Sequence, residues 1–300
     1  MSTCTTLSRA LAEPMGGTAT TGAGWLLLEQ PGPWGAKALT QSHLDPALGR
    51  ALESRARDTG LRIGLIRRPG RHADCPPNPS RHVFLAHTRP GLSWVRELRT
   101  ADPADLLDLD FAALGAGAHD GVGSAYRGDP LALVCTNGRR DRCCALLGRP
   151  LAAELAAAGH AQVWETTHLG GHRFSPTVLV LPYGYAYGRL TPESAKEVLA
   201  ATHEGRMAPE WCRGRSYWEP AGQAAELAVR AHTGEDRAEV LTLRQTPTVT
   251  GWSVAVDHRD GRGWTVEVTA GVSLPPRSQS CGAELVTPAR YEAGPVLRTR

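Results

Sequence analysis

The order of secondary-structure elements predicted from the hydrophobic pattern constrains the fold most, because it occurs twice along the chain. Both halves predict strand, helix, three strands and helix. In the first half, strands are expected at residues 25–29, 61–66, 83–87 and 93–98, and helices at 46–58 and 103–113. In the second half, strands are expected at 131–134, 161–165, 177–181 and 185–189, and helices at 150–158 and 192–203.

This βαβββα order is that of a thioredoxin-like unit. The sequence therefore predicts an α/β protein with two thioredoxin-like units, at residues 20–115 and 125–205. We expect the first unit to lack a cofactor site, because it contains no set of residues that matches the ligands described below. The remaining residues, 206–300, are expected to form a small C-terminal appendage of a helix and a β-hairpin.

Two patterns support the appendage. A helical pattern covers residues 220–232, and the alternating runs 249–256 and 264–268 lie on either side of a turn at Asp260-Gly261. The tail from Leu274 is rich in Pro, so we expect it to be only partly ordered.

The composition excludes several classes of protein. With 41% hydrophobic and 21% charged residues in 300, the chain has enough apolar side chains for a core. No uncharged apolar run approaches the roughly 20 residues that a membrane helix needs. A net charge of +3 gives no support to nucleic-acid binding. Residues 1–24 lack the basic start and apolar block of a secretory signal, so we expect a cytoplasmic protein without membrane insertion.

The cysteines indicate metal or redox chemistry, because seven is an odd number and no export signal is present. Residues 135–144 begin at Cys135 and end at Cys143-Cys144, and residues 168–172 read His-Leu-Gly-Gly-His. Each segment follows a predicted strand. Parallel strands joined by a helix end at the same edge of a sheet, so the thiols should face the imidazoles. Gly170 and Gly171 would let the backbone approach a ligand closely.

The spacing leaves the metal open. His168 and His172, with three residues between them, suit zinc, but the eight residues between Cys135 and Cys144 do not match a zinc-finger pair. A [2Fe–2S] cluster accepts a wider spacing because each iron has its own ligand pair, and His ligands on one iron raise its reduction potential. Cys143 and Cys144 are neighbours whose side chains diverge, so both are not expected to bind one iron.

Three arginines stand in the same loop as the cysteines. Arg139, Arg140 and Arg142 would stabilise the negative charge of a reduced cluster if they point toward it. The alternative is that they are solvated or pair with Asp141.

Three motifs resemble the sucrase/ferredoxin-like family: residues 27–35, 135–144 and 164–177. That family is similar to thioredoxin-like [2Fe–2S] ferredoxins, with the two histidines standing where those ferredoxins have a Cys pair. The resemblance implies that the cluster ligands are Cys135, Cys144, His168 and His172, with Cys143 as the alternative to Cys144. Sugar hydrolysis gains no support, because no pair of acidic residues stands out.

The expected function is that of an electron carrier rather than an enzyme with its own substrate. One [2Fe–2S] cluster would exchange single electrons with redox partner proteins, a reductase or an oxidase. Two alternatives remain: a structural zinc protein that uses the same four residues, and a thioredoxin-like thiol oxidoreductase that uses Cys143 or Cys144. The second lacks the Cys-x-x-Cys pair typical of that chemistry. The other cysteines, Cys4, Cys75, Cys212 and Cys281, are expected to be buried small side chains or free thiols.

Overall fold

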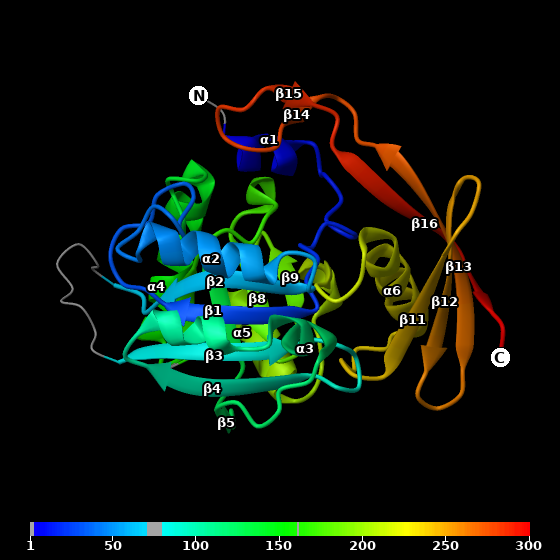
Figure 1. Ribbon diagram of the computed structural model, residues 1–300. Coiled ribbons are helices and arrows are strands. Elements are labelled where there is room, and N and C mark those ends of the chain that lie inside the picture. Colours follow the sequence, from blue (N-terminus) through cyan, green and yellow to red (C-terminus); the bar gives the residue numbers. More distant parts are fainter. Residues whose placement is uncertain (1–2, 71–79, 161) are drawn as a thin grey trace.

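A mixed sheet of ten strands makes up most of the molecule, and the computed structural model describes residues 3–70, 80–160 and 162–300 (Figure 1). The first half supplies the strands β1 (Gly24–Glu29), β2 (Leu61–Arg67), β3 (Arg81–His87), β4 (Trp94–Thr100) and β5 (Ser124–Ala125). Its helices are α2 (Pro46–Ala56), the 3-10 helix η1 (Pro103–Asp108) and α3 (Phe111–Ala116). The N-terminal helix α1 (Cys4–Ala10) precedes them.

The second half supplies the strands β6 (Leu131–Cys135), β7 (Val163–Thr166), β8 (Thr177–Leu181), β9 (Tyr185–Gly188) and β10 (Cys212–Arg215). Its helical segments are the π-helical turn η2 (Cys144–Gly148), α4 (Arg149–Ala157), the 3-10 turn η3 (His172–Phe174) and α5 (Pro192–His203). The chain continues with η4 (Pro209–Trp211), α6 (Pro220–Thr233), β11 (Leu241–Pro247), β12 (Gly251–His258), β13 (Gly263–Val272), β14 (Arg277–Ser278), β15 (Leu285–Val286) and β16 (Ala289–Arg298).

Both halves of the large sheet have the same connections. The sheet order is β10-β9-β8-β6-β7-β2-β1-β3-β4-β5. In the first half, β1 is parallel to β2 and antiparallel to β3. In the second, β6 is parallel to β7 and antiparallel to β8. The repeated element order predicted from the sequence is therefore present, and the fold is mixed α/β.

The halves meet where β2 pairs with β7 through only two residue pairs, Ile66 with Thr166 and Arg67 with Glu165. An ion pair reinforces this junction: the guanidinium of Arg67 lies 2.7 Å from Glu165 Oε2, and both side chains are buried. The Thr136 hydroxyl donates to the same oxygen at 2.9 Å. The junction therefore depends on side-chain contacts as well as on the ladder.

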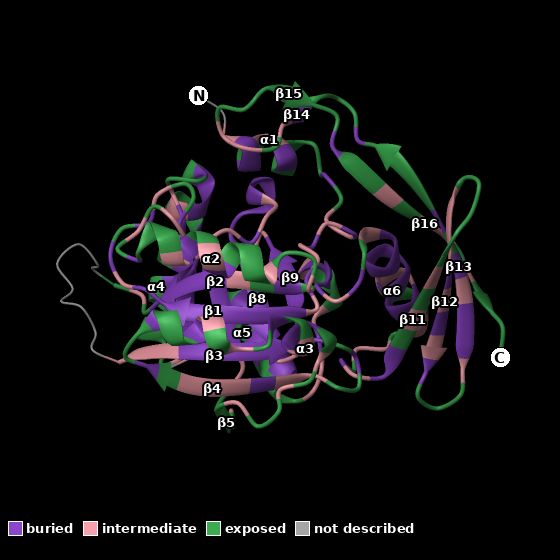
Figure 2. Ribbon diagram, in the orientation of Figure 1, coloured by how far each residue is buried: buried purple, intermediate pink, exposed green. Residues whose placement is uncertain are grey.

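Successive side chains along a strand point to opposite faces of the sheet, so a hydrophobic cluster lies on each face. Leu26 and Leu28 of β1 face α2 and α3, whereas Trp25 and Leu27 point to the opposite side. There they join a cluster built mainly from strands of both halves, in which the rings of Phe84 and Trp164 meet edge to face at 5.5 Å. The inner faces of the two half-sheets thus pack on each other, and Figure 2 shows the central strands as buried.

Helices cover the outer faces. In the second half, Val134 of β6 packs with Leu151 of α4 and Val198 of α5. Thr191 begins α5 as its N-cap in a capping box with Ser194. In the part of the chain that the structure describes, no helix combines the length and apolar character needed to cross a bilayer.

The C-terminal region contains more regular structure than expected. The helix at 220–232 and the hairpin around Asp260-Gly261 are present as α6, β12 and β13. The tail, which the sequence led us to expect to be only partly ordered, forms β16, which pairs with β13 in the sheet β11-β12-β13-β16. Residues 212–215, which the sequence places in the appendage, pair with β9 of the large sheet.

The single helix expected at 103–113 is also different. It is two helices, η1 and α3, because Asp110 interrupts the first and caps the second by accepting a hydrogen bond from the Ala113 N–H at 2.9 Å.

Replacing Glu165 should weaken the junction between the halves. Glu165→Ala removes the carboxylate that faces the buried Arg67 guanidinium, and we expect the free energy of unfolding to fall by about 3–5 kcal/mol. As a matched control, Glu204→Ala removes an exposed ion pair with Arg206 and should cost less than about 1 kcal/mol. Urea denaturation followed by circular dichroism measures both, and equal effects would contradict this account.

Candidate metal centre

The carboxyl ends of β6 and β7 bring the expected ligands to one edge of the sheet. Cys135 is the last residue of β6 and pairs with Thr166, the last residue of β7. Cys144 starts η2, and His172 starts η3. This parallel pairing brings the two loops side by side, as the sequence predicted.

Two thiols and two imidazoles converge in this place. Cys144 Sγ lies 3.3 Å from His172 Nδ1, and the rings of His168 and His172 stack with centroids 4.3 Å apart. Cys135 and Cys144 are close enough for each thiol to shift the pKa of the other. The two cysteines and His172 are buried, and His168 is half-buried. Among the described residues, His168 Nδ1 is a buried nitrogen without a hydrogen-bond partner. Buried polar atoms are nearly always paired with a protein group, an ordered water or an ion, and a neutral imidazole nitrogen in this position is able to bind a metal.

Both imidazoles are held in the neutral form. Burial lowers the pKa of His168 to about 3, and the charges of His172 and Arg140 act in the same direction. Burial also lowers the pKa of His172, although Asp141 opposes the shift. The neutral imidazole is the form that binds a metal ion.

The sulfur of Cys135 is held in an environment that favours a thiolate. The Cys144 thiol lowers the pKa of Cys135, and backbone N–H groups of Leu169 and Asn137 act in the same direction, against the effect of burial. The pKa of Cys144 is raised by its contact with Cys135 and by burial. As the pH rises, Cys135 therefore loses its proton before Cys144.

Contacts within the protein give the Gly170-Gly171 turn a reason beside the ligand approach that the sequence suggested. Both residues have a left-handed backbone, with φ of +74° and +68°. A Cβ on Gly170 would lie 2.4 Å from Thr20 Oγ1, and one on Gly171 would lie 2.2 Å from the Arg213 guanidinium. The missing side chains therefore make room for Thr20 and Arg213 against the loop.

Arg213 is a buried cation that the sequence did not reveal. It comes from β10, and its guanidinium donates to the carbonyl of Gly170 and to the Thr18 hydroxyl, each at 3.1 Å. Burial lowers its pKa to about 10, so it stays charged at neutral pH. Arg139, Arg140 and Arg142, the expected neighbours, are exposed, and of the three only Arg140 acts on the pKa of His168 and His172.

Cys143 belongs to a second group of thiols. Its Sγ lies 3.2 Å from Cys281 Sγ and 3.5 Å from Cys4 Sγ, and those two sulfurs are 3.6 Å apart. Cys4 and Cys281 are free thiols, as expected. The sequence did not indicate that α1 and the C-terminal tail bring both of them to the loop of residues 135–144. Cys212 is a buried free thiol, as expected, and Cys75 lies outside the described residues.

Asp141 stands between the two groups. Its carboxylate accepts hydrogen bonds from the Cys143 N–H, the Ser280 hydroxyl and the Cys281 N–H at 2.7–2.8 Å. Burial tends to raise its pKa, but these hydrogen bonds lower it. Metal-ligating atoms of Cys4, Asp141, Cys143 and Cys281 all lie within 4.8 Å of one another, as do those of Asp141, Cys144 and His172. The sequence left open whether Asp141 pairs with the arginines of its own loop. In the structure its carboxylate instead makes the contacts described above.

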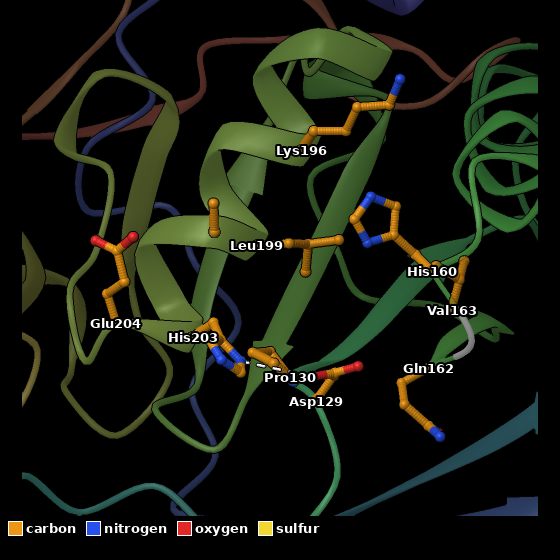
Figure 3. Close-up of a pocket in the computed structure, with 10 residues that line it drawn as sticks. Asp129, Pro130, His160, Gln162, Val163, Lys196, Leu199, His203 and Glu204 are labelled. Carbon is orange, nitrogen blue, oxygen red and sulfur yellow. Dashed lines mark ion pairs between the residues drawn. The ribbon is translucent and has the colours of Figure 1, made fainter.

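A cavity of about 350 Å³ lies at the other end of β6, beside Asp129 and Pro130 (Figure 3). His203 Nδ1 and Asp129 Oδ1 face each other there at 3.5 Å, but both side chains are largely exposed. The thiols follow the carboxyl end of the strand, so this cavity is separate from the metal-ligating groups.

The fold and the site define a mixed α/β protein in which Cys, His and Asp side chains form groups suited to holding a metal ion. The chain belongs to the sucrase/ferredoxin-like family, whose sequence model matches residues 15–214. No curated protein and no solved structure gave a match in the comparison.

Gly171 offers a test of the loop geometry. Gly171→Ala must displace Arg213 in addition to placing a Cβ on a left-handed backbone. Gly234→Ala is the matched control, because its φ is +70° and no atom lies within 4 Å of the new Cβ. Both variants have a backbone strain of about 1–2 kcal/mol, and we expect Gly171→Ala to be less stable than the control by a further 1 kcal/mol or so. Urea denaturation that ranks the two as equal would show that Arg213 does not pack tightly against the loop.

Proposed function

We propose that Cys135, Cys144, His168 and His172 hold a [2Fe–2S] cluster and that the protein carries single electrons. The main support is the convergence of two buried thiols and two neutral imidazoles, one of which has a buried nitrogen without a hydrogen-bond partner among the described residues. Membership of a ferredoxin-like family supports the same conclusion. We interpret the two equally connected halves as thioredoxin-like units, of which the second provides the ligands.

The donor set suits this cofactor. Thiolate and imidazole are the ligands of Cys/His-ligated [2Fe–2S] centres, and such a cluster supplies reversible one-electron chemistry. Neutral histidines in place of two thiolates leave the site less negative and raise the reduction potential. The burial that keeps both imidazoles neutral therefore serves this ligation directly.

The surrounding residues stabilise added negative charge. The N–H groups of Leu169 and Asn137 donate to the sulfur of Cys135, and hydrogen bonds to a ligating sulfur raise a cluster's potential. The buried charge of Arg213 acts in the same direction. Cys144 and Cys135, each about 1% exposed, lie where water is excluded.

His168 is the most exposed of the four ligands, so we propose that electrons enter and leave on its side. The exposed guanidinium groups of Arg139, Arg140 and Arg142 belong to the adjoining loop. A redox partner with an acidic surface, a reductase or an oxidase, would be attracted to this side.

A mononuclear zinc site is the second candidate. Asp141, Cys144 and His172 offer donors within 4.8 Å of one another. The 3.3 Å between Cys144 Sγ and His172 Nδ1 is close to the roughly 3.5 Å that separates sulfur and nitrogen ligands of one tetrahedral zinc. Colour separates the candidates, because a [2Fe–2S] protein is red-brown and a zinc protein is colourless.

The decisive experiment is anaerobic purification followed by iron and acid-labile sulfide analysis, visible absorption and EPR after reduction with dithionite. We expect about two irons and two sulfides per chain. A colourless protein that contains zinc at these residues would establish the second candidate. Metal-free protein that reduces disulfides would instead support a thiol oxidoreductase.

Variants of His168 and His172 test whether the two histidines bind the cluster. His168→Ala and His172→Ala should each lose most of the iron and the visible spectrum, whereas His203→Ala, at the distant cavity, should keep both. Replacing both ligand histidines by Cys should retain a cluster whose potential is lower by roughly 200 mV or more, because two thiolates add negative charge. An unchanged potential in a loaded double variant would exclude histidine ligation.

A further inference from the structure

We propose that Cys4, Asp141, Cys143 and Cys281 form a second metal site, which holds a structural zinc ion and fastens both ends of the chain to the loop of residues 135–144. This site is distinct from the first, because it uses none of the residues Cys135, Cys144, His168 and His172. Cys4 and Cys281 also lie outside residues 15–214, the part that matches the family.

The sulfur positions indicate a metal ion rather than a disulfide. The three Sγ–Sγ separations are 3.2, 3.5 and 3.6 Å. A disulfide requires about 2.05 Å. Three thiolates on one tetrahedral zinc, with Zn–S bonds of about 2.3 Å, lie roughly 3.8 Å apart. All three observed separations are nearer to the zinc value, and they hold for every pair in the group, whereas a disulfide would join only two of the sulfurs.

Asp141 completes the tetrahedron. Its Oδ2 accepts hydrogen bonds from the Ser280 hydroxyl and the Cys281 N–H. Oδ1 accepts the N–H of Cys143 and the thiol of Cys4, and that thiol loses its proton when a metal binds. A carboxylate oxygen accepts two hydrogen bonds, so Oδ1 keeps a lone pair for a metal. Its distance to Cys4 Sγ is 3.9 Å, near the roughly 3.5 Å expected between oxygen and sulfur ligands of one zinc.

The donor set favours zinc over calcium, magnesium and iron(II). Three thiolates and one carboxylate are four protein ligands, which fill a tetrahedral zinc and leave no open position, as in structural sites. Calcium and magnesium require oxygen ligands, and iron(II) binds such donors more weakly than zinc. Cys4, Asp141 and Cys143 are each at most 3% exposed, and Cys281 is half-buried, so the group is covered except on the side of Cys281. When zinc binds, each thiol releases its proton to solvent as the metal–sulfur bond forms.

The site joins two segments, α1 and the residues around Cys281, whose described contacts with the loops of residues 135–144 and 168–172 involve side chains. In Figure 1, α1 lies beside β14 and β15, although they come from opposite ends of the chain. Buried Glu13 pairs with Arg173 at 2.8 Å and with Arg277 at 3.0 Å, and the Thr5 hydroxyl donates to the carbonyl of His172 at 3.1 Å. A bound zinc ion would hold α1 and the segment around Arg277 in place over the loop that carries His172.

The test is zinc analysis of the purified full chain after growth with zinc. Titration of the thiols with a mercurial should release about one zinc per chain from this site, detected with a colorimetric chelator. Cys4→Ser and Cys281→Ser should each reduce the zinc content by about one equivalent. Cys212→Ser, which changes a buried thiol outside the group, should leave it unchanged.

Two further measurements keep the result interpretable if a variant folds poorly. In the unaltered protein, Cys4, Cys143 and Cys281 should resist alkylation until the zinc is removed, as peptide mass spectrometry can report. Iron and sulfide measured in the same samples report on the first site alone, so one proposal can fail without the other. Zinc content unaffected by both Ser variants, free alkylation of the three thiols, or a disulfide among them would each overturn this proposal.

Discussion

The parallel pairing of β6 with β7 is the constraint on which the site depends. Because the crossover through α4 returns the chain in the same direction, both strands end at one edge of the sheet. The last residue of β6, Cys135, and the loops that follow the two strands carry all of the thiols and imidazoles that we propose as ligands of the first site. The central position of these strands in the ten-stranded sheet, buried on both faces, fixes that edge firmly.

The edge of the sheet would still be open to solvent without the two ends of the chain. Helix α1 and the segment around Arg277 meet over the loop that carries His172, and Glu13 lies between two arginines there. Burying three charged groups is favourable only because each has a partner. The cover shields His172 from water, whereas His168 stays partly exposed, and burial lowers the pKa values of both.

Local patterns predicted most of the central fold because the signals that they use are local. The N-caps of α2 at Asp45 and of α5 at Thr191 are short-range interactions of this kind. Local sequence patterns gave a wrong prediction where pairing between distant segments decides the structure. The Pro-rich tail becomes β16 because β13 offers it an unpaired edge, and no local signal records that edge.

The sequence by itself predicted which strands end beside one another, and so it predicted that the cysteines of residues 135–144 should face His168 and His172. Spacing within one strand–helix–strand unit carries that information. Only the tertiary structure decided where Cys143 points, because its partners Cys4 and Cys281 are 139 and 138 residues away. The same holds for Arg213, which reaches the loop from another strand. Contacts between such distant residues arise when the whole chain packs, and neighbouring residues in the sequence do not encode them.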